Sequence, residues 1–259
     1  MRKNINWLFL NTYPGQIMLQ TWLTSQGIER SSSSKYVKEG LLKRLDTGVY
    51  CRAGKEPGWV DAVHCLQTQW NKPVHVAGLT SLNLQGSSHY LELSTARMWL
   101  NLPPRVYLPK WLQHVPGVKW YSAANNRLES ADNAFLKEVT VSSLKITCSS
   151  AELAAYEVAN NVPKLIEFTH ANELFQGLIS LNPKKLQLIL SASDAVKTNR
   201  VFMFLAQRNQ HKWFERLDVT RIKMGNGARQ IEAGGRLDTD YQITVPASLI
   251  RNIREDEQF

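Results

Sequence analysis

The 259-residue sequence has few cysteines and no long apolar run. Its three cysteines, Cys51, Cys65 and Cys148, lie far apart and form no CxxC pair, so neither a disulfide framework nor a zinc site is expected. The longest purely apolar stretch, Val201 to Ala206, has six residues, whereas a bilayer span needs roughly 20. The run Trp7 to Leu10 is too short for a signal-peptide core. We therefore expect a protein of the reducing cytoplasm with no membrane segment.

Sequence motifs of common catalytic sites are missing as well. There is no GxxxxGK phosphate loop and no GxGxxG, HExxH or GxSxG motif. The six histidines show no metal-ligand spacing, and the adjacent pair His64 and Cys65 cannot face each other on a helix. Asp238 and Asp240 could bind a metal, although a turn after two glycines is the commoner reason for such a pair. The sequence therefore predicts no catalytic residue, metal site or cofactor, and we expect the protein not to be an enzyme.

Positive charge is abundant and concentrated in two blocks. The chain has 31 basic and 22 acidic residues, a net charge of +9, which favours nucleic acid or another acidic surface as a partner. Residues 1–58 contain 9 basic and 4 acidic residues, a net charge of +5. Residues 184–229 contain 10 and 3, a net charge of +7. Two blocks so far apart indicate either one long surface or two separate tasks.

The first block has the outline of a winged helix-turn-helix. Pro14 suits the first turn of a helix, and Gly27 interrupts the apolar pattern that follows. A second short helix is expected after the possible N-cap serines of 31–34 and before Gly40. Two short runs around Asp46-Thr47-Gly48 are typical of a β-hairpin.

In such a fold the second helix enters the major groove and the hairpin lies beside the neighbouring backbone. We therefore expect serine contacts to bases or phosphates, and basic side chains on phosphates. The alternatives are that the serines form a linker, or that the hairpin contacts protein. The candidate DNA-binding residues are Ser32, Ser33, Lys35, Tyr36, Lys38, Lys43, Arg44 and Arg52.

The rest of the chain mixes helices and strands, so the predicted fold class is α+β. We expect a winged helix-turn-helix domain over 1–58 and a mixed α/β domain over 59–259, which could consist of two lobes, 59–144 and 145–259. Helices are predicted over 59–70, 79–84, 151–157, 171–180, 183–191 and 195–207. Strands are predicted over 105–108, 139–148, 221–224, 230–232 and 241–245.

The second basic block lies on several of these elements. Only three acidic residues, Asp194, Glu215 and Asp218, interrupt it, so local ion pairs cannot neutralise it. It predicts a positive face on the second half of the chain, although solvated faces of amphipathic helices would leave the same pattern. The candidate residues of this face are Lys184, Lys185, Lys197, Arg200, Arg208, Lys212, Arg216, Arg221 and Lys223.

Several stretches together resemble the AbiEi antitoxins of type IV toxin–antitoxin systems, which are linked to abortive infection of phage-infected bacteria. Residues 40–50 are similar to the wing of that family, with Thr47 where arginine is common. The order of later motifs is the more specific part of the resemblance, which extends over nearly the whole chain. These motifs lie at 72–82, 149–152, 174–178, 196–202, 213, 234–238 and 241–246.

The resemblance implies an antitoxin without enzymatic activity that represses its own operon. Its winged helix would bind inverted repeats in operator double-stranded DNA, with two copies per operator. Its C-terminal domain would counteract a nucleotidyltransferase-like toxin through a positive face, without forming a stable complex. Two other functions stay open: a nuclease or other nucleic-acid enzyme targeted by a winged helix, and a plain ligand-responsive transcriptional repressor.

Overall fold

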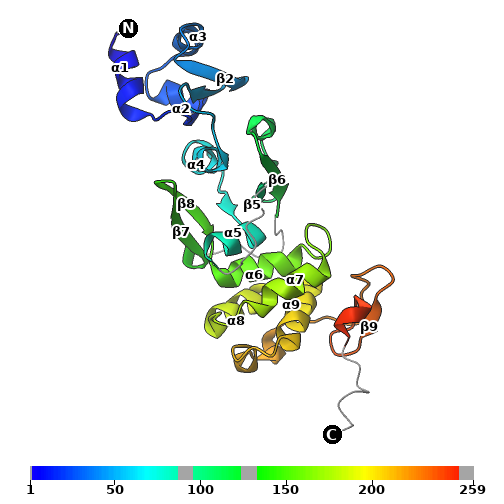
Figure 1. The fold of residues 1–259 in the computed structure, drawn as a ribbon. Coiled ribbons are helices and arrows are strands. Elements are labelled where there is room, and N and C mark those ends of the chain that lie inside the picture. The colour runs from blue at the N-terminus through cyan, green and yellow to red at the C-terminus, as the bar shows by residue number, and fades with distance from the viewer. Residues whose placement is uncertain (1, 87–95, 124–132, 251–259) are drawn as a thin grey trace. The chain divides into compact units, whose positions relative to one another are not determined.

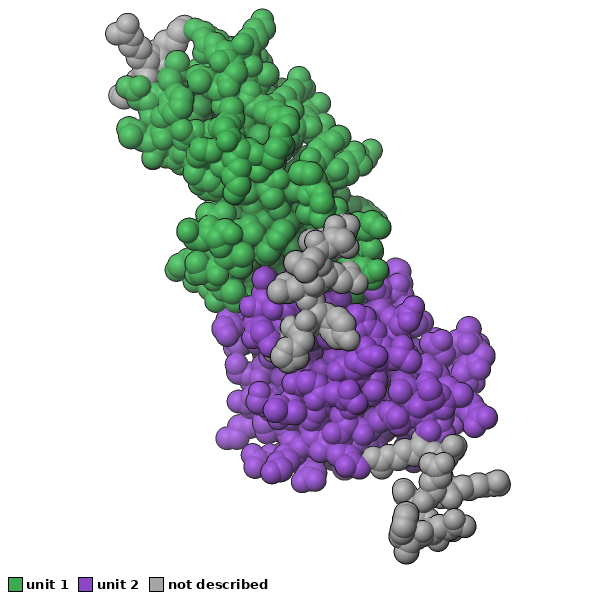
Figure 2. All heavy atoms as spheres, in the orientation of Figure 1, with its two compact units in different colours: residues 1–76, 92–124, 138–148 green, residues 77–91, 125–137, 149–259 purple. Residues whose placement is uncertain are grey.

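The computed structural model describes residues 2–86, 96–123 and 133–250, which form two compact units (Figure 2). The first unit comprises residues 1–76, 92–124 and 138–148, and the second comprises 77–91, 125–137 and 149–259. The chain therefore crosses between the units several times. None of the helices in the described part is long and apolar enough to span a membrane.

The first 52 residues build a winged helix-turn-helix (Figure 1). Three strands form an antiparallel sheet in the order β1-β3-β2, in which Ile17 pairs with Cys51 and Lys43 also pairs with Cys51 from the other side. The hairpin predicted from the sequence is confirmed as β2 and β3. The elements are α1 (Arg2–Asn11), β1 (Ile17–Leu19), α2 (Gln20–Ser25), α3 (Arg30–Lys38), β2 (Leu42–Asp46) and β3 (Val49–Arg52).

Each of the six elements contributes a buried apolar or aromatic side chain to the core of this fold. Leu8 of α1, Leu23 of α2 and Tyr36 of α3 are buried together with Met18, Ile28, Leu42 and Tyr50. The predicted helix between Pro14 and Gly27 was partly wrong, because residues 17–19 pair with β3 as a strand and α2 begins only at Gln20. The first helix is instead α1, which the sequence reading did not predict.

The winged helix is followed by α4 (Trp59–Gln69), a predicted helix that the structure confirms. Its Asp61 carboxylate accepts a hydrogen bond from the Gly58 N–H at 2.8 Å, which closes the first turn. Its last residue, Gln69, accepts from the Leu19 N–H at 2.9 Å and donates to the Ile17 carbonyl at 3.0 Å. This side-chain amide satisfies the outer edge of β1, so α4 is tied to the sheet of the winged helix. The domain boundary at residue 58 stays a prediction.

Beyond α4 the chain builds a five-stranded mixed sheet in the order β6-β5-β4-β8-β7. β5 lies antiparallel to β4 and parallel to β6, and β4 lies parallel to β8. The predicted strand over 105–108 is wrong: these residues form no strand, and Arg105 has a positive φ of 63°. The strands are β4 (His75–Val76), β5 (Ala96–Asn101), β6 (Val118–Ser122), β7 (Leu136–Val141) and β8 (Leu144–Ser149).

Helices dominate the second unit (Figure 1). Residues 152–159 of α6 are all buried, and α6 packs against α5, α7, α8 and α9. The Ser150 hydroxyl accepts a hydrogen bond from the Leu153 N–H at 3.4 Å and caps α6. By contrast, the predicted N-cap role of the serines at 31–34 is wrong, because α3 begins at Arg30 with Glu29 as its N-cap and these serines lie inside the helix. The helices are α5 (Gly78–Leu84), α6 (Ala151–Asn160), α7 (Phe168–Gln176), α8 (Pro183–Ala192) and α9 (Val196–Arg208), which confirms a helix at each predicted position.

The last described residues form a two-stranded antiparallel sheet of β9 (Arg236–Asp238) and β10 (Ile243–Val245). The predicted strand over 241–245 is thereby confirmed in part. Residues 221–224 and 230–232 form no strand, so those two predictions are wrong. The α+β class is confirmed, because the chain combines these helices with three separate sheets.

Candidate nucleic-acid interface

The α3 helix divides into a buried and a solvent-facing side. Ser33 and Tyr36 have 0% and 1% of their surface exposed. Ser31, Ser34 and Lys38 are exposed, and Lys35 is partly exposed. These four residues are spaced i, i+3, i+4 and i+7, which places them on one stripe of the helix. The stripe is hydroxyl-rich toward the start of α3 and cationic toward its end.

Two of the predicted DNA contacts therefore belong to the core. The Ser33 hydroxyl donates to the Glu29 carbonyl at 3.4 Å, within its own helix. Tyr36 packs in the apolar core of the winged helix, and burial raises the pKa of its phenol. The prediction that Ser33 and Tyr36 face DNA was wrong, because their neighbours in the sequence occupy the outer side of the helix. Ser32 is half-buried beside the stripe.

Sequence reasoning missed the outer residues at the start of α3. A surface hollow of about 720 Å³ lies between α2 and α3. Ser31 and the exposed Arg30 line it on the α3 side, and Thr21 and Thr24 line it on the α2 side. The signal that could have found them is the helical period, because fixing Tyr36 as a core residue also fixes which serines point outward.

The wing contributes two exposed basic side chains, Lys43 and Arg44. The Lys43 ammonium lies 2.7 Å from a Glu56 carboxylate oxygen, and this hydrogen bond raises the pKa of Lys43. Arg44 donates to the Asp46 carbonyl and to the Thr47 hydroxyl, both at 3.3 Å. These contacts direct Arg44 along β2 toward the turn, while Lys43 has a competing acidic partner within the wing.

Arg52, the third predicted wing contact, serves a different purpose. Its guanidinium donates to the Phe9 carbonyl at 3.2 Å and to both the carbonyl and the hydroxyl of Thr12. The same group lies 4.6 Å from the centroid of the Phe9 ring. Carbonyls at the end of a helix attract positive charge, so Arg52 holds α1 against β3. These contacts give Arg52 a structural role, and its predicted contact with DNA stays a prediction.

The predicted basic residues of the second unit fall into two groups. The exposed residues lie on α8 and in the segment that follows α9, which contains two 3-10 turns. The other group is built into the fold: Lys197 donates to the Val162 carbonyl, and Arg208 donates to the Leu249 carbonyl at 2.6 Å. Lys185, Lys197 and Arg208 are partly buried, whereas the exposed residues are Lys184, Lys212, Arg216, Arg221 and Lys223.

Arg200 is not a surface residue, although the sequence counts it among the basic block. Only 2% of it is exposed. Its guanidinium donates to the carbonyls of Met224 at 2.6 Å, Gly225 at 3.0 Å and Gly227 at 2.6 Å, and to that of Gln242 at 3.1 Å. The prediction that Arg200 forms part of an exposed face was wrong, because the residue fastens the 223–227 segment to α9.

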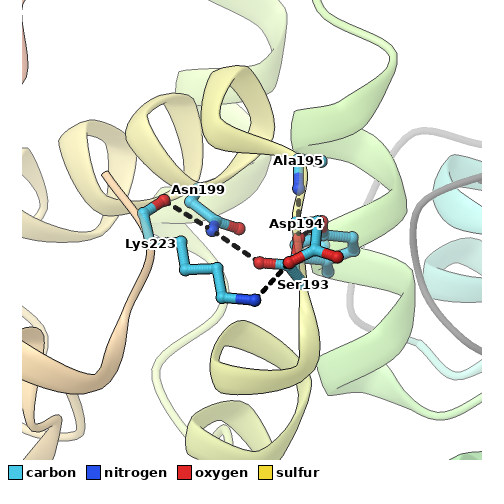
Figure 3. Close-up of polar contacts among 6 residues, drawn as sticks. Ser193, Asp194, Ala195, Asn199 and Lys223 are labelled. Atoms are coloured by element: carbon cyan, nitrogen blue, oxygen red, sulfur yellow. Dashed lines mark hydrogen bonds and ion pairs between the residues drawn. The ribbon is translucent and has the colours of Figure 1, made fainter. Parts of the chain in front are cut away.

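The residue before it, Asn199, completes this fastening (Figure 3). Its amide nitrogen donates to the Lys223 carbonyl at 3.0 Å and to the Ser193 carbonyl at 3.3 Å. The Lys223 ammonium in turn forms an ion pair with Asp194. The path of the chain after Asp218 is therefore fixed by Asn199, Arg200 and Asp194. The ion pair with Asp194 also holds the exposed Lys223 side chain in place.

The residues that the sequence offered for metal binding or nucleophilic chemistry make contacts that serve the fold. Asp238 accepts a hydrogen bond from the Tyr241 N–H at 2.8 Å, which is turn chemistry. Burial raises the pKa of Cys65, which disfavours its thiolate. Within 2–86, 96–123 and 133–250, no group of three or more His, Cys, Asp or Glu residues is placed to hold a metal ion.

Comparison with known proteins agrees with the architecture. Residues 1–93 match the family described as the N-terminal domain of the transcriptional regulator AbiEi antitoxin, and residues 95–246 match the family described as the transcriptional regulator AbiEi antitoxin of type IV toxin–antitoxin systems. No curated protein matches the chain. The crystal structure of the RV2827C protein from Mycobacterium tuberculosis is similar in fold, with a TM-score of 0.59 and 15% identity over 93% of this chain and 89% of that one. The chain belongs to the AbiEi antitoxin family of type IV toxin–antitoxin systems, a family of transcriptional regulators.

Proposed function

We propose that this protein represses its own operon by binding inverted repeats in the promoter through the winged helix. The observation that carries this proposal is the outward stripe of α3, Ser31, Ser34, Lys35 and Lys38, beside the exposed cations of the wing. Hydroxyls can hydrogen-bond to base edges, and the lysines supply salt-dependent affinity for phosphates. The contact set is therefore Arg30, Ser31, Ser32, Ser34, Lys35, Lys38, Lys43 and Arg44.

Two copies occupy each operator in this proposal. One winged helix reads only a short half-site, and two protomers on an inverted repeat multiply the specificity. The second unit counteracts a nucleotidyltransferase-like toxin without a stable complex, and its exposed basic residues meet an acidic partner. The protein acts by binding rather than by catalysis, in the cytoplasm where its operon lies.

The test is an electrophoretic shift with the DNA upstream of the gene. We expect a shift that is not abolished by competition with a scrambled duplex of equal length. The mass of the shifted complex should correspond to two protomers per operator. A single protomer saturating the operator would contradict the two-copy proposal. Equal affinity for scrambled DNA would contradict sequence-specific repression.

The toxin-directed role is tested in full-length protein by reversing three exposed charges, Lys184→Glu, Lys212→Glu and Arg216→Glu. Protection of cells from the cognate toxin should be lost while the operator shift is retained. The matched control reverses three exposed lysines of the first unit, Lys72→Glu, Lys110→Glu and Lys119→Glu, and it should protect normally. Full protection by the first variant would show that its positive face is only solvated surface.

A further inference from the structure

The segment after Asp218 contains a short basic loop with two glycines. Residues 221–229 read Arg-Ile-Lys-Met-Gly-Asn-Gly-Ala-Arg, with three basic residues and no acidic residue. Residues 225–230 are all exposed. Gly225 and Gly227 have positive φ values of 59° and 72°. A Cβ on Gly225 would lie 3.1 Å from both Cγ atoms of Val196, so the loop lies against the start of α9 at a point where a side chain does not fit.

The orientation of the peptide groups in this loop follows from its hydrogen bonds. Asn199 binds the Lys223 carbonyl, and Arg200 binds the carbonyls of Met224, Gly225 and Gly227. In a planar trans peptide the N–H of the next residue points opposite to the carbonyl. The N–H groups that therefore point away from α9 belong to Met224, Gly225, Asn226 and Ala228.

These four N–H groups donate no hydrogen bond to any other described residue. Three of them belong to exposed residues, and Met224 is partly exposed. Consecutive amides turned outward in a glycine-containing loop form a concavity that attracts anions. The loop therefore offers several donors to one external ligand.

The charged side chain beneath the loop, that of Arg200, is positive, which also favours an anion. All four hydrogen bonds of the Arg200 guanidinium end on carbonyl oxygens rather than on a carboxylate. Its positive charge thus aligns the peptide dipoles with their N–H ends outward. The Arg229 N–H and the Arg200 guanidinium both donate to the Gln242 carbonyl, at 2.8 and 3.1 Å, which places Arg229 close to the same site. Lys223 is not counted as a ligand because Asp194 already pairs with it.

We propose that the outward amides of Met224, Gly225, Asn226 and Ala228, together with Arg229, bind a phosphate group of a nucleotide or of a nucleic-acid backbone. The inference deepens the proposed function, since the loop lies within the second basic block. Phosphate binding is measured without toxin or operator DNA, so the two proposals can fail separately. Asn199 and Arg200 are positioning residues for this site, because they hold the carbonyl side of each peptide.

The experiment titrates ¹⁵N-labelled full-length protein with inorganic phosphate at constant ionic strength and follows the backbone amides by NMR. We expect saturable downfield proton shifts at Gly225, Asn226 and Ala228, because hydrogen bonding to an anion deshields the amide proton. Further titrations use ADP and a short single-stranded RNA. The probe that saturates the same amides at the lower concentration identifies the source of the phosphate. No saturable shift with any of the three probes, or equal shifts with chloride, would overturn the proposal.

Two matched variants separate the site from general positive charge. Arg229→Gln should weaken phosphate binding by about two- to fivefold, the effect of one exposed charge pair. Lys164→Gln removes an equally exposed charge outside the loop and should leave the affinity unchanged. Equal weakening by both variants would mean that phosphate responds only to net charge and would refute the site.

Discussion

The guanidinium of Arg52 lies 4.6 Å from the centre of the Phe9 ring and donates to the Phe9 carbonyl at 3.2 Å. These contacts join the last residue of β3 to the end of α1. They turn an arginine of the wing hairpin back onto its own domain. Positive charge in the winged helix is therefore divided between exposed side chains and the scaffold that supports them.

Arg52→Gln should destabilise the winged helix without changing its intrinsic affinity for DNA. Hydrogen bonds from a charged group and a cation–π contact are lost together, which should lower the free energy of unfolding by about 1–3 kcal/mol. Urea denaturation followed by tryptophan fluorescence measures this change, and the operator shift is measured well below the midpoint. A stable variant with weakened DNA binding would return Arg52 to the interface.

Tyr36 provides a second separation of core from interface. Tyr36→Phe keeps the buried ring and should leave both stability and operator affinity nearly unchanged. Tyr36→Ala removes most of a buried side chain and should cost about 3–5 kcal/mol. Thermal unfolding and the shift assay measure the two variants side by side. If the phenylalanine variant folds normally yet loses operator affinity, the hydroxyl contacts DNA after all.

Turns and helix starts that are determined by neighbouring residues could be predicted from the sequence. Gly48 in the hairpin turn has a φ of 72°, and this turn chemistry is readable from three residues. Asn182 accepts from the Lys184 and Lys185 N–H groups at 3.0 and 3.3 Å just before Pro183, a helix start that the sequence also marks. The hairpin of the wing and the start of α8 were therefore predictable from the sequence.

Elements that depend on distant partners were not predictable in this way. Ile17 and Leu19 look helical in sequence, but pairing with Cys51 and Val49 makes them a strand. Arg200 looks like any other basic residue of α9 until its carbonyl partners, 24 to 42 positions away, are known. Ser33, Tyr36 and Arg200 were misplaced for the same reason: composition reports charge and polarity, whereas burial decides which side chains can reach a ligand.

Because Arg200 holds the 223–227 segment, replacing it should destabilise the protein far more than replacing an exposed arginine. Arg200→Leu should cost about 2–4 kcal/mol, because four carbonyls lose a charged donor. Arg216→Leu, at an exposed position outside α9, should change stability by under about 0.5 kcal/mol. Thermal unfolding measures both, and limited proteolysis should cut the 223–229 loop faster in the first variant. Similar stability of the two would show that the buried guanidinium is dispensable.

A close backbone approach makes any side chain at Gly235 unfavourable. A Cβ there would lie 2.5 Å from the Val245 carbonyl oxygen, so Gly235→Ala must displace β10 and should cost about 1–3 kcal/mol. At Gly58 the nearest atom to a new Cβ is a flexible Asp61 oxygen at 3.7 Å, and Gly58→Ala should be tolerated. Melting temperatures decide between them, and equal melting temperatures would contradict the packing of β10 described above.

The central claim, that the outer stripe of α3 and the wing contact DNA phosphates, is tested most directly by the salt dependence of operator binding. Each lost phosphate contact reduces the slope of log K against log salt by roughly one unit. We predict that Lys35→Gln, Lys38→Gln and Arg44→Gln combined weaken binding and flatten the slope by about three units. Lys55→Gln, an exposed charge beside Gly15 rather than on α3, should leave the slope unchanged. An unaltered slope in the triple variant would contradict the account.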